Sequence, residues 1–167
     1  MKLNATILIL ISFLFSCNTS ESRHDLSNFD SPLGTGFYFI KDTATSFKRQ
    51  LIKTTDIYSI DPTPIVTTKN FEKVEMFHEK DCYALLIWLD KKGSQLLDAA
   101  RQNYKGKKFA IIVDNQLLRT QLVDDPQFAT VSEKDDPRIY RQVLAFPCNS
   151  FQPRELKNYE TIINKEE

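Results

Sequence analysis

Three cysteines and two histidines are the residues of this 167-residue chain best suited to nucleophilic, acid–base or metal chemistry. Cys82 and Cys148 do not combine with His24 or His78 into the close ligand spacing of a zinc site. His78 adjoins an expected turn, which favours a solvated residue at a strand edge over a catalytic base. The chain contains no Gly-x-Ser-x-Gly, no Walker loop and no His-Glu-x-x-His. We therefore predict no catalytic residues, no metal site and no cofactor.

A group of acidic residues between two expected strands is the other candidate cluster. A calcium loop needs alternating ligands and a closing glutamate, and because that spacing is absent, we interpret the group as a solvated acidic loop. Neighbouring carboxylates in an extended chain point in opposite directions, so no acid–base pair is predicted either. The residues are Asp124, Asp125, Glu133, Asp135 and Asp136.

Cys17 has a different context, at the end of an N-terminal apolar segment. Lys2 precedes Ala5 to Phe15, which is too short to span a bilayer but suits the apolar part of a signal peptide. Leu14-Phe15-Ser16-Cys17 resembles a bacterial lipobox, in which the cysteine thiol receives a diacylglycerol and becomes the first mature residue. Two or three acyl chains give lasting membrane attachment. The alternatives are an ordinary secretory signal with an incidental Cys17, or an uncleaved anchor.

The compartment implied by this signal bears on the oxidation state of the other two cysteines. If Cys17 is acylated, Cys82 and Cys148 lie outside the cytoplasm, where disulfides persist. A disulfide requires the ends of their two strands to be neighbours, with Cα atoms within about 7 Å. Two buried free thiols are the alternative, because cysteine is common in protein cores. The sequence leaves both possibilities open.

Composition and charge indicate one globular domain behind a tether. With 41% apolar residues, a chain of this length can bury a core. Residues 1–16 are expected to be a lipoprotein signal peptide, residues 17–33 a polar flexible tether, and residues 34–167 a single domain. Twenty-two basic residues balance twenty-two acidic ones, so no nucleic-acid partner is predicted.

The predicted core of the domain is the stretch from Asp81 to Val123. Cys82 to Leu89 is an unbroken apolar run, which indicates a central strand covered on both faces. Asp90 can cap the following helix, and Gly106 supplies its left-handed stop. Two further strands, Phe109 to Val113 and Gln116 to Val123, are predicted to pair about the turn Asp114-Asn115.

A second helix has the clearest start signal in the chain. Pro153 suits the first helical position, Glu155 occupies the capping-box position, and Phe151 can pack against Leu156. Each helix has one apolar stripe, which needs a sheet to cover. The stripes are Gly93, Leu96, Leu97, Ala100 and Tyr104 in the first helix, and Leu156, Tyr159, Ile162 and Ile163 in the second.

The remaining segments are predicted to be extended. Thr45 to Lys53 fits a strand or a helix, and we favour the strand. Thr68 is expected to cap one helical turn holding Phe71 and Val74. The other expected strands are Gly36 to Ile40, Ile57 to Ile60, Glu75 to His78, Phe128 to Val131 and Gln142 to Phe146. The predicted class is α+β, a mixed and mostly antiparallel sheet with two helices packed on one face.

The stretch from Leu89 to Val123 resembles the head of the first periplasmic domain of SecD and SecDF, membrane components that assist protein export. The resemblance rests on Gly93, Gly106-Lys107, the run AIIVD and the turn at Asp114-Asn115. Flanking pieces extend it over roughly Ser59 to Ile163. Three features depart from the family: Asn115 replaces the usual glycine, and a proline and a glycine pair expected after it are missing.

This resemblance implies a stand-alone periplasmic head. SecD has several membrane helices with charged residues, whereas no spanning segment is expected here after residue 17, so the chain is not predicted to be a translocase motor. We expect a non-enzymatic envelope lipoprotein, held to a membrane by the lipid on Cys17, that contacts envelope or exported proteins. The alternatives are a small envelope hydrolase or ligand-binding lipoprotein with an unrecognised pocket, or a lipoprotein that binds one secreted partner.

Overall fold

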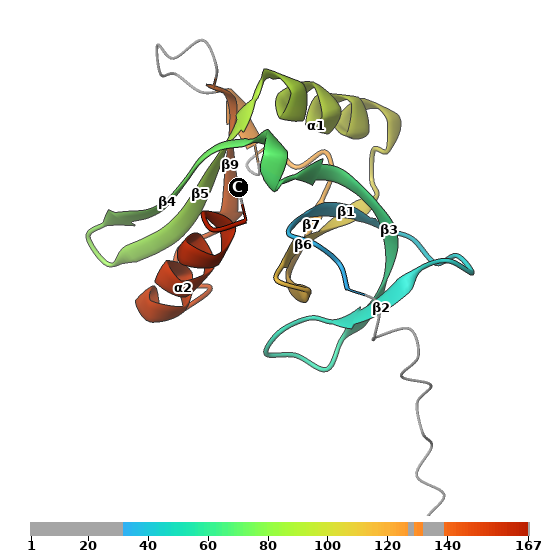
Figure 1. Ribbon diagram of the computed structural model, residues 1–167, viewed down its shortest axis with the longest axis horizontal. Coiled ribbons are helices and arrows are strands. Elements are labelled where there is room, and N and C mark those ends of the chain that lie inside the picture. Colours follow the sequence, from blue (N-terminus) through green and yellow to red (C-terminus); the bar gives the residue numbers. More distant parts are fainter. Residues whose placement is uncertain (1–31, 127–128, 132–138, 167) are drawn as a thin grey trace, which may run out of the picture.

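The computed structural model describes residues 32–126, 129–131 and 139–166 (Figure 1). Strands dominate this part of the chain, with two α-helices and one short 3-10 turn, η2 (Thr68–Asn70). The strands are β1 (Gly36–Ile40), β2 (Phe47–Gln50), β3 (Ile57–Thr67), β4 (Phe71–Glu79), β5 (Cys82–Asp90), β6 (Lys108–Val113), β7 (Gln116–Leu122), β8 (Ala129–Val131) and β9 (Ile139–Phe146); the helices are α1 (Lys91–Asn103) and α2 (Pro153–Ile163).

The predicted α+β class is confirmed, but the strands form two sheets where the sequence suggested one. One sheet has the order β2-β3-β1-β6-β7, and the other has the order β4-β5-β9-β8. All strand pairs in both sheets are antiparallel. β5 is central, as predicted, with β4 and β9 on its two edges. Because both edges of β5 are occupied, β6 pairs with β1 in the other sheet.

The five-stranded sheet curls into a small barrel. Its two outer strands approach each other where Leu51, just after β2, forms a parallel bridge with Leu117 on β7. The amide of Ile52 donates to the carbonyl oxygen of Leu117 at 3.0 Å. In Figure 1 the strands of this sheet, β1, β2, β3, β6 and β7, curve around one another. Closing a sheet in this way protects edge strands that would otherwise pair with other chains.

Successive side chains along each barrel strand point to opposite faces of the sheet, so they are divided between two cores. In β6, Ala110 and Ile112 face the barrel interior, whereas Phe109 and Ile111 face the larger core outside it. The barrel interior is filled by Leu33, Tyr38, Ile60, Ala110, Ile112 and Leu117, all buried.

The larger core lies between the barrel and the four-stranded sheet. β5 contributes Leu85, Ile87 and Leu89, each at most 1% exposed, and α2 contributes Leu156, Tyr159 and Ile163. Figure 1 shows α2 beside β4 and β5. The opposite face of β5 is also buried, since Ala84, Leu86 and Trp88 are at most 8% exposed. The prediction of a central strand covered on both faces is therefore confirmed.

The predicted cap at the start of α1 is confirmed, but the helix ends at Asn103 with Tyr104 as its C-cap, ahead of the predicted stop at Gly106. Its predicted apolar stripe is buried at Gly93, Leu97 and Ala100 only. The Asp90 carboxylate accepts a hydrogen bond from the Gly93 amide at 2.5 Å, and Gly106 has a φ of 72° in the loop that follows. Leu96 is 39% exposed and Tyr104 is 48% exposed, although both were expected to be buried. Both side chains line a hollow between α1 and β3, which leaves them partly open to solvent.

The start of α2 follows its sequence signals closely. Pro153 is the first helical residue, and the Glu155 carboxylate accepts a hydrogen bond of 2.7 Å from the Gln152 amide, which completes a capping box. Phe151 and Leu156 are buried in the larger core. Ring contacts with Phe151 hold Tyr159 at a centroid distance of 5.5 Å.

Two local predictions need correction. Phe71 and Val74 lie in β4 rather than in a helical turn, because the turn ends at Asn70 and both residues pair with β5. Leu33 was placed in the tether but is 4% exposed inside the barrel. The folded domain therefore includes Leu33. For Thr45 to Lys53, the favoured strand is confirmed as β2.

Candidate functional site

The structure joins Cys82 and Cys148 in a disulfide, with Cα atoms 4.9 Å apart. The sequence left open either a disulfide or two free thiols, and the structure has the disulfide. The bridge connects the start of β5 to the segment after β9, and the Asn149 amide donates to the Tyr83 carbonyl oxygen beside it at 3.3 Å. Cys148 is exposed to solvent. This cystine links two segments of the chain and does not line any pocket described below.

The other chemistry-bearing residues do not converge. His78 is exposed and stacks on the Tyr83 ring at a centroid distance of 4.2 Å. Asp124 accepts from the Gly106 amide, whereas the Asp125 side chain contacts Gln121. Within residues 32–126, 129–131 and 139–166, no three His, Cys, Asp or Glu side chains form a group that could hold a metal. Outside these ranges lie Cys17, His24, Glu133, Asp135 and Asp136.

A groove between α1 and β3, which we call the α1–β3 groove, is the candidate functional site. It consists of two adjoining hollows of about 420 and 380 Å³ that share Phe39, Asp61 and Tyr104. One wall is a helical face formed by Leu96, Ala99, Ala100 and Asn103, and the other is formed by Thr63, Pro64 and Ile65 of β3. Lys41, Asp42 and Lys107 line its far end, together with Ile40.

Two aromatic rings form the middle of the groove. The rings of Phe39 on β1 and Tyr104 after α1 lie 4.3 Å apart between centroids and are tilted by 45°. Tyr104 is nearly half exposed, so its ring offers an apolar surface to solvent. With Leu96 on the same side of α1, this is one of the few places in the described chain where large apolar side chains are exposed.

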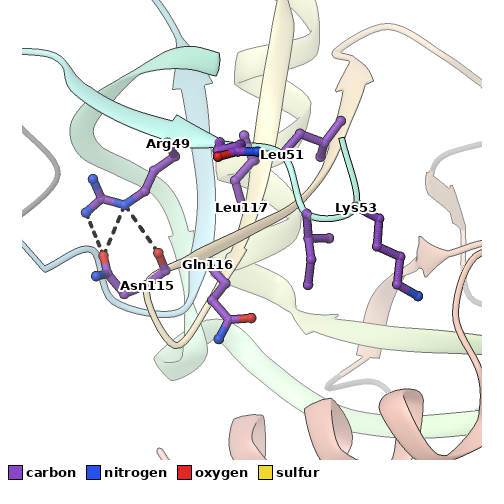
Figure 2. A pocket seen from close by; sticks show the side chains of 8 residues that line it. Arg49, Leu51, Lys53, Asn115, Gln116 and Leu117 are labelled. Carbon is purple, nitrogen blue, oxygen red and sulfur yellow. Dashed lines mark hydrogen bonds between the residues drawn. The ribbon is translucent and has the colours of Figure 1, made fainter. Parts of the chain in front are cut away.

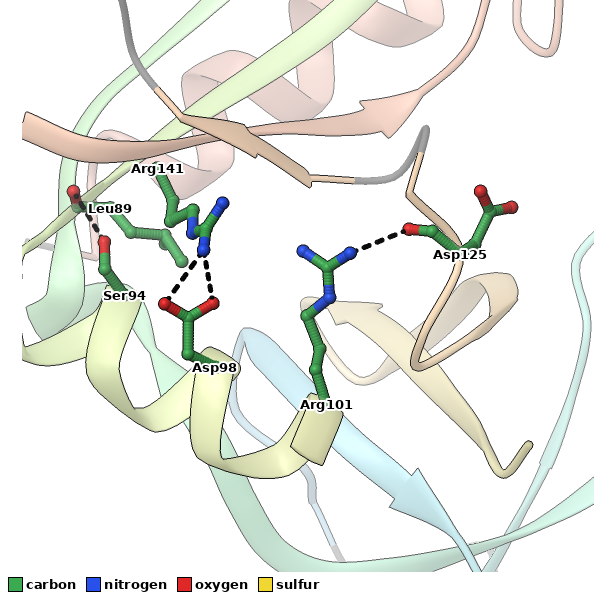
Figure 3. A network of polar contacts seen from close by, with 6 residues as sticks. All are labelled: Leu89, Ser94, Asp98, Arg101, Asp125 and Arg141. Atoms are coloured by element: carbon green, nitrogen blue, oxygen red, sulfur yellow. Dashed lines mark hydrogen bonds and ion pairs between the residues drawn. The ribbon is translucent and has the colours of Figure 1, made fainter. Parts of the chain in front are cut away.

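Polar contacts on the opposite side of α1 hold the helix in place (Figure 3). Arg141 of β9 binds both carboxylate oxygens of Asp98, at 2.8 and 3.0 Å. Arg101 donates to the main-chain carbonyl oxygen of Asp125 at 3.3 Å. Because Asp98 and Arg101 face β9 and the loop after β7, Leu96 and Asn103 are left facing the groove.

The β3 wall of the groove bulges away from its partner strand. Tyr38 pairs with Pro64 and Ile40 pairs with Ile60, so four steps along β3 match two along β1. The Asp61 carboxylate accepts a hydrogen bond of 3.0 Å from the Thr63 amide, which stabilises the bulge. Bulges of this kind redirect a strand and its side chains. Here the bulge carries Thr63 and Pro64 into contact with the groove.

The charged groups at the far end of the groove differ in their partners. Asp61 accepts from its own turn, and Asp42 accepts from the Ser59 hydroxyl at 3.2 Å. Among the described residues, the ammonium groups of Lys41 and Lys107 have no hydrogen-bond or ion-pair partner. This end therefore carries two ammonium groups and two carboxylates beside an aromatic surface.

A second hollow, of about 370 Å³, lies at the closure of the barrel (Figure 2). Two of its polar residues, Arg49 and Asn115, are hydrogen-bonded to each other. The Asn115 side-chain oxygen accepts hydrogen bonds from Arg49 Nη2 at 2.6 Å, from Arg49 Nε at 3.2 Å and from the Leu33 amide at 2.9 Å. Burial lowers the pKa of the Arg49 guanidinium. We interpret this cluster as a structural connection between the chain entry, β2 and the β6–β7 turn.

Sequence reasoning missed the groove for two reasons. The stripe of α1 predicts a buried Leu96 and a buried Tyr104, whereas both face the groove. The two prolines of β3 do signal an irregular extended segment, but nothing local indicates that this segment lies opposite α1.

None of the helices in the described part of the chain is long and apolar enough to cross a bilayer. In comparisons with known proteins, neither the protein-family models nor the curated proteins yield a match to this chain.

Proposed function

We propose that this chain is a lipid-anchored lipoprotein of the bacterial cell envelope, whose domain binds other proteins and has no enzymatic activity of its own. The anchor is assigned to Cys17, on the basis of the lipobox-like Leu14-Phe15-Ser16-Cys17. The resemblance of Ser59 to Ile163 to the SecD periplasmic head supports a role in contacting envelope or exported proteins. In this proposal the protein acts as a stand-alone head and not as a translocase motor.

The observation that carries the binding role is the α1–β3 groove. Grooves that bind polypeptide segments combine apolar surface with a few polar groups that orient the ligand. The groove has this composition: Leu96 and Tyr104 supply exposed apolar surface, and lysines lie at one end. Aromatic side chains are also enriched in the parts of interfaces that contribute most to affinity.

Photo-crosslinking in living cells tests the binding role. A photoreactive amino acid placed at Leu96 or Tyr104 should give protein adducts of the same mass from both positions. Arg154, which is exposed on α2, is the matched control and should give none. Absence of adducts from both groove positions, with normal membrane localisation of the variants, would contradict the proposal.

The anchor has a separate test. Globomycin blocks cleavage of lipoprotein signal peptides, so treated cells should accumulate a precursor heavier by residues 1–16. Replacement of Cys17 by Ser should abolish incorporation of labelled palmitate. If the inhibitor leaves the precursor-to-mature ratio unchanged, the anchor assignment fails. The crosslinking experiment would then still test the binding role of the groove.

A further inference from the structure

We propose that the Cys82–Cys148 disulfide is a site of reversible thiol exchange, and that the reactant it takes is a dithiol that attacks the sulfur of Cys148. This inference concerns the chemistry of the cystine and goes beyond the binding role of the groove and the lipid anchor. It follows from the unequal exposure of the two cysteines and from the contacts that hold their segments independently of the bond.

The two halves of the cystine differ in exposure. Cys148 is exposed and begins a run of three exposed residues, Cys148, Asn149 and Ser150, in the turn between β9 and α2. Cys82 is partly buried and belongs to β5, where it pairs with Glu79 of β4. In thiol–disulfide exchange the attacking thiolate must reach one of the two sulfurs, and exposed disulfides are the more labile ones. Cys148 is therefore the half of the cystine that a thiol reaches first.

The turn that carries Cys148 is fastened on both sides by buried rings. Phe146 and Phe151 are at most 7% exposed, and their ring centroids lie 5.0 Å apart. Between them, the Asn149 amide donates to the Tyr83 carbonyl oxygen at 3.3 Å. None of these contacts involves a sulfur atom. Cleavage of the disulfide should therefore loosen this turn without detaching it from β5.

The segment that carries Cys82 is held by strand pairing. β5 pairs with β4 along its length, as far as Cys82 itself, and with β9 as far as the pair Leu85 and Phe146. Helix α2 also has its own contact with this sheet, because the Glu160 carboxylate accepts a hydrogen bond of 3.1 Å from the Met76 amide. With both segments held, the two thiols stay close together after reduction. The bond can therefore re-form in the folded protein.

The exchange takes two balanced steps. A thiolate of the dithiol attacks the Cys148 sulfur, the S–S bond breaks, and its electron pair leaves on the Cys82 sulfur, which takes a proton from solvent. The second thiol of the dithiol then loses its proton, attacks the dithiol's sulfur in the mixed disulfide and releases Cys148, which is protonated in turn. In total the dithiol is oxidised to a disulfide, and the cystine gains two electrons and two protons.

The site of attack is mapped with a monothiol, which stops the reaction at the mixed disulfide. The mature lipidated protein in nonionic detergent is treated briefly with 2-mercaptoethanol and then with excess N-ethylmaleimide, which blocks the freed cysteine. Trypsin cleaves after Lys80, Lys91, Arg141 and Arg154, so mass spectrometry sees the two cysteines in separate peptides. The mercaptoethanol adduct should be at least about five-fold more abundant on Cys148 than on Cys82, because access controls the rate.

Concentrated urea is the matched control, since both cysteines are accessible in the unfolded chain and the preference for Cys148 should disappear. Two variants give an independent measurement. The single thiol of Cys82→Ser, which is Cys148, should react with N-ethylmaleimide at least about five-fold faster than the single thiol of Cys148→Ser. Far-UV circular dichroism checks that both variants are folded, and the adduct map of the parent protein decides if they are not.

Reversibility is measured with a dithiol. Dithiothreitol should reduce the cystine without urea and without loss of the far-UV circular dichroism signal. After its removal, oxidised glutathione should restore the disulfide in the folded protein. Reduction that occurs only as that signal is lost, or failure of the bond to re-form, would overturn the exchange site.

The remaining outcomes concern the sulfur that is attacked. Adducts mainly on Cys82, or equally on both cysteines of the folded protein, would overturn the assignment of Cys148. Resistance of the cystine to both thiols in the absence of urea would overturn the whole inference. Each of these results leaves the crosslinks from Leu96 and the lipid on Cys17 untouched, so the proposed function stands or fails by its own tests.

Discussion

The guanidinium of Arg119 on β7 donates a hydrogen bond of 2.7 Å to the main-chain carbonyl oxygen of Leu144 on β9. The same nitrogen donates to the carbonyl oxygen of Ala145 at 3.0 Å, and the other terminal nitrogen donates to Gln121 at 2.6 Å. Burial lowers the pKa of Arg119, and the Asp125 carboxylate acts in the opposite direction. This side chain connects the barrel to the four-stranded sheet.

Replacement of Arg119 by Met should therefore destabilise the domain. The variant keeps much of the apolar stem but leaves the Leu144 and Ala145 carbonyl oxygens without this donor, and hydrogen bonds to charged groups contribute about 1.5–3 kcal/mol each. We expect a loss of about 2–3 kcal/mol in the free energy of unfolding, measured by urea denaturation. Arg154→Met, on the exposed face of α2, is the control and should change stability by less than about 0.5 kcal/mol.

A second prediction concerns the β6–β7 turn. Asp114 and Asn115 both have positive φ, of 46° and 63°, where glycine is less strained. Asn115→Gly relieves this strain but removes the acceptor for Arg49 and Leu33, so we expect a net loss of about 1–2 kcal/mol. Asp114→Gly relieves strain without removing that acceptor, and should be neutral or slightly stabilising. Equal effects of the two changes would show that the Asn115 side chain adds nothing to stability.

The disulfide gives a third prediction. Cys82 and Cys148 are 66 residues apart, and a closed loop of this length is expected to stabilise the fold by about 4 kcal/mol on the chain-entropy account. Because Cys148 is exposed, a reductant should release both thiols without denaturant, detected as two alkylations by mass spectrometry. The urea midpoint should fall on reduction. The Cys82→Ser/Cys148→Ser variant should already have the lower midpoint and should not respond to the reductant.

The fourth prediction is a pH dependence at the start of α2. A side-chain hydrogen bond from Lys53, followed by the Gln152 amide, lowers the pKa of Glu155 below 4.5. A carboxyl whose folded pKa is lowered stabilises the fold above its unfolded pKa. The contribution of Glu155 is therefore complete above about pH 4.5. It is lost as the pH falls through the lowered folded value.

Glu155→Gln keeps a capping-box acceptor and removes the charge. At pH 7 it should lower the free energy of unfolding by about 0.5 kcal/mol, since both side chains are partly exposed, and the difference from the parent should shrink toward pH 3. Urea denaturation across this range measures it. Glu79→Gln, at an exposed position, is the control. A Glu155→Gln deficit that stays constant down to pH 3 would show that the charge of Glu155 is not its cause.

Local sequence patterns were sufficient for several elements. The unbroken apolar run beginning at Cys82 predicts a strand covered on both faces, because only a buried strand can hide apolar side chains on both sides. Pro153 and Glu155 predict the start of α2, since capping depends on residues within one turn of the helix. Asp114 and Asn115 likewise predict the hairpin, because few residue types tolerate positive φ.

Features that depend on contacts between distant residues were not predictable in this way. The bridge between Leu51 and Leu117 closes the barrel, and Cys82 pairs with Cys148, although neither pairing has a local signal. The stripe of α1 indicates which residues share a face of the helix, but not whether a sheet covers that face. In the structure this side of α1 faces β3 across a hollow, which leaves Leu96 and Tyr104 partly exposed.

By itself the sequence determined the α+β class, the central strand, the starts of both helices and the lipobox-like pattern at Cys17, because each depends on residue types at short spacing. The division into a barrel and a second sheet, and with it the α1–β3 groove, was decided by the tertiary structure. The physical reason is that a strand has two edges. β5 uses both for β4 and β9, whereas β6 pairs with β1, and no local pattern specifies which strand takes each edge.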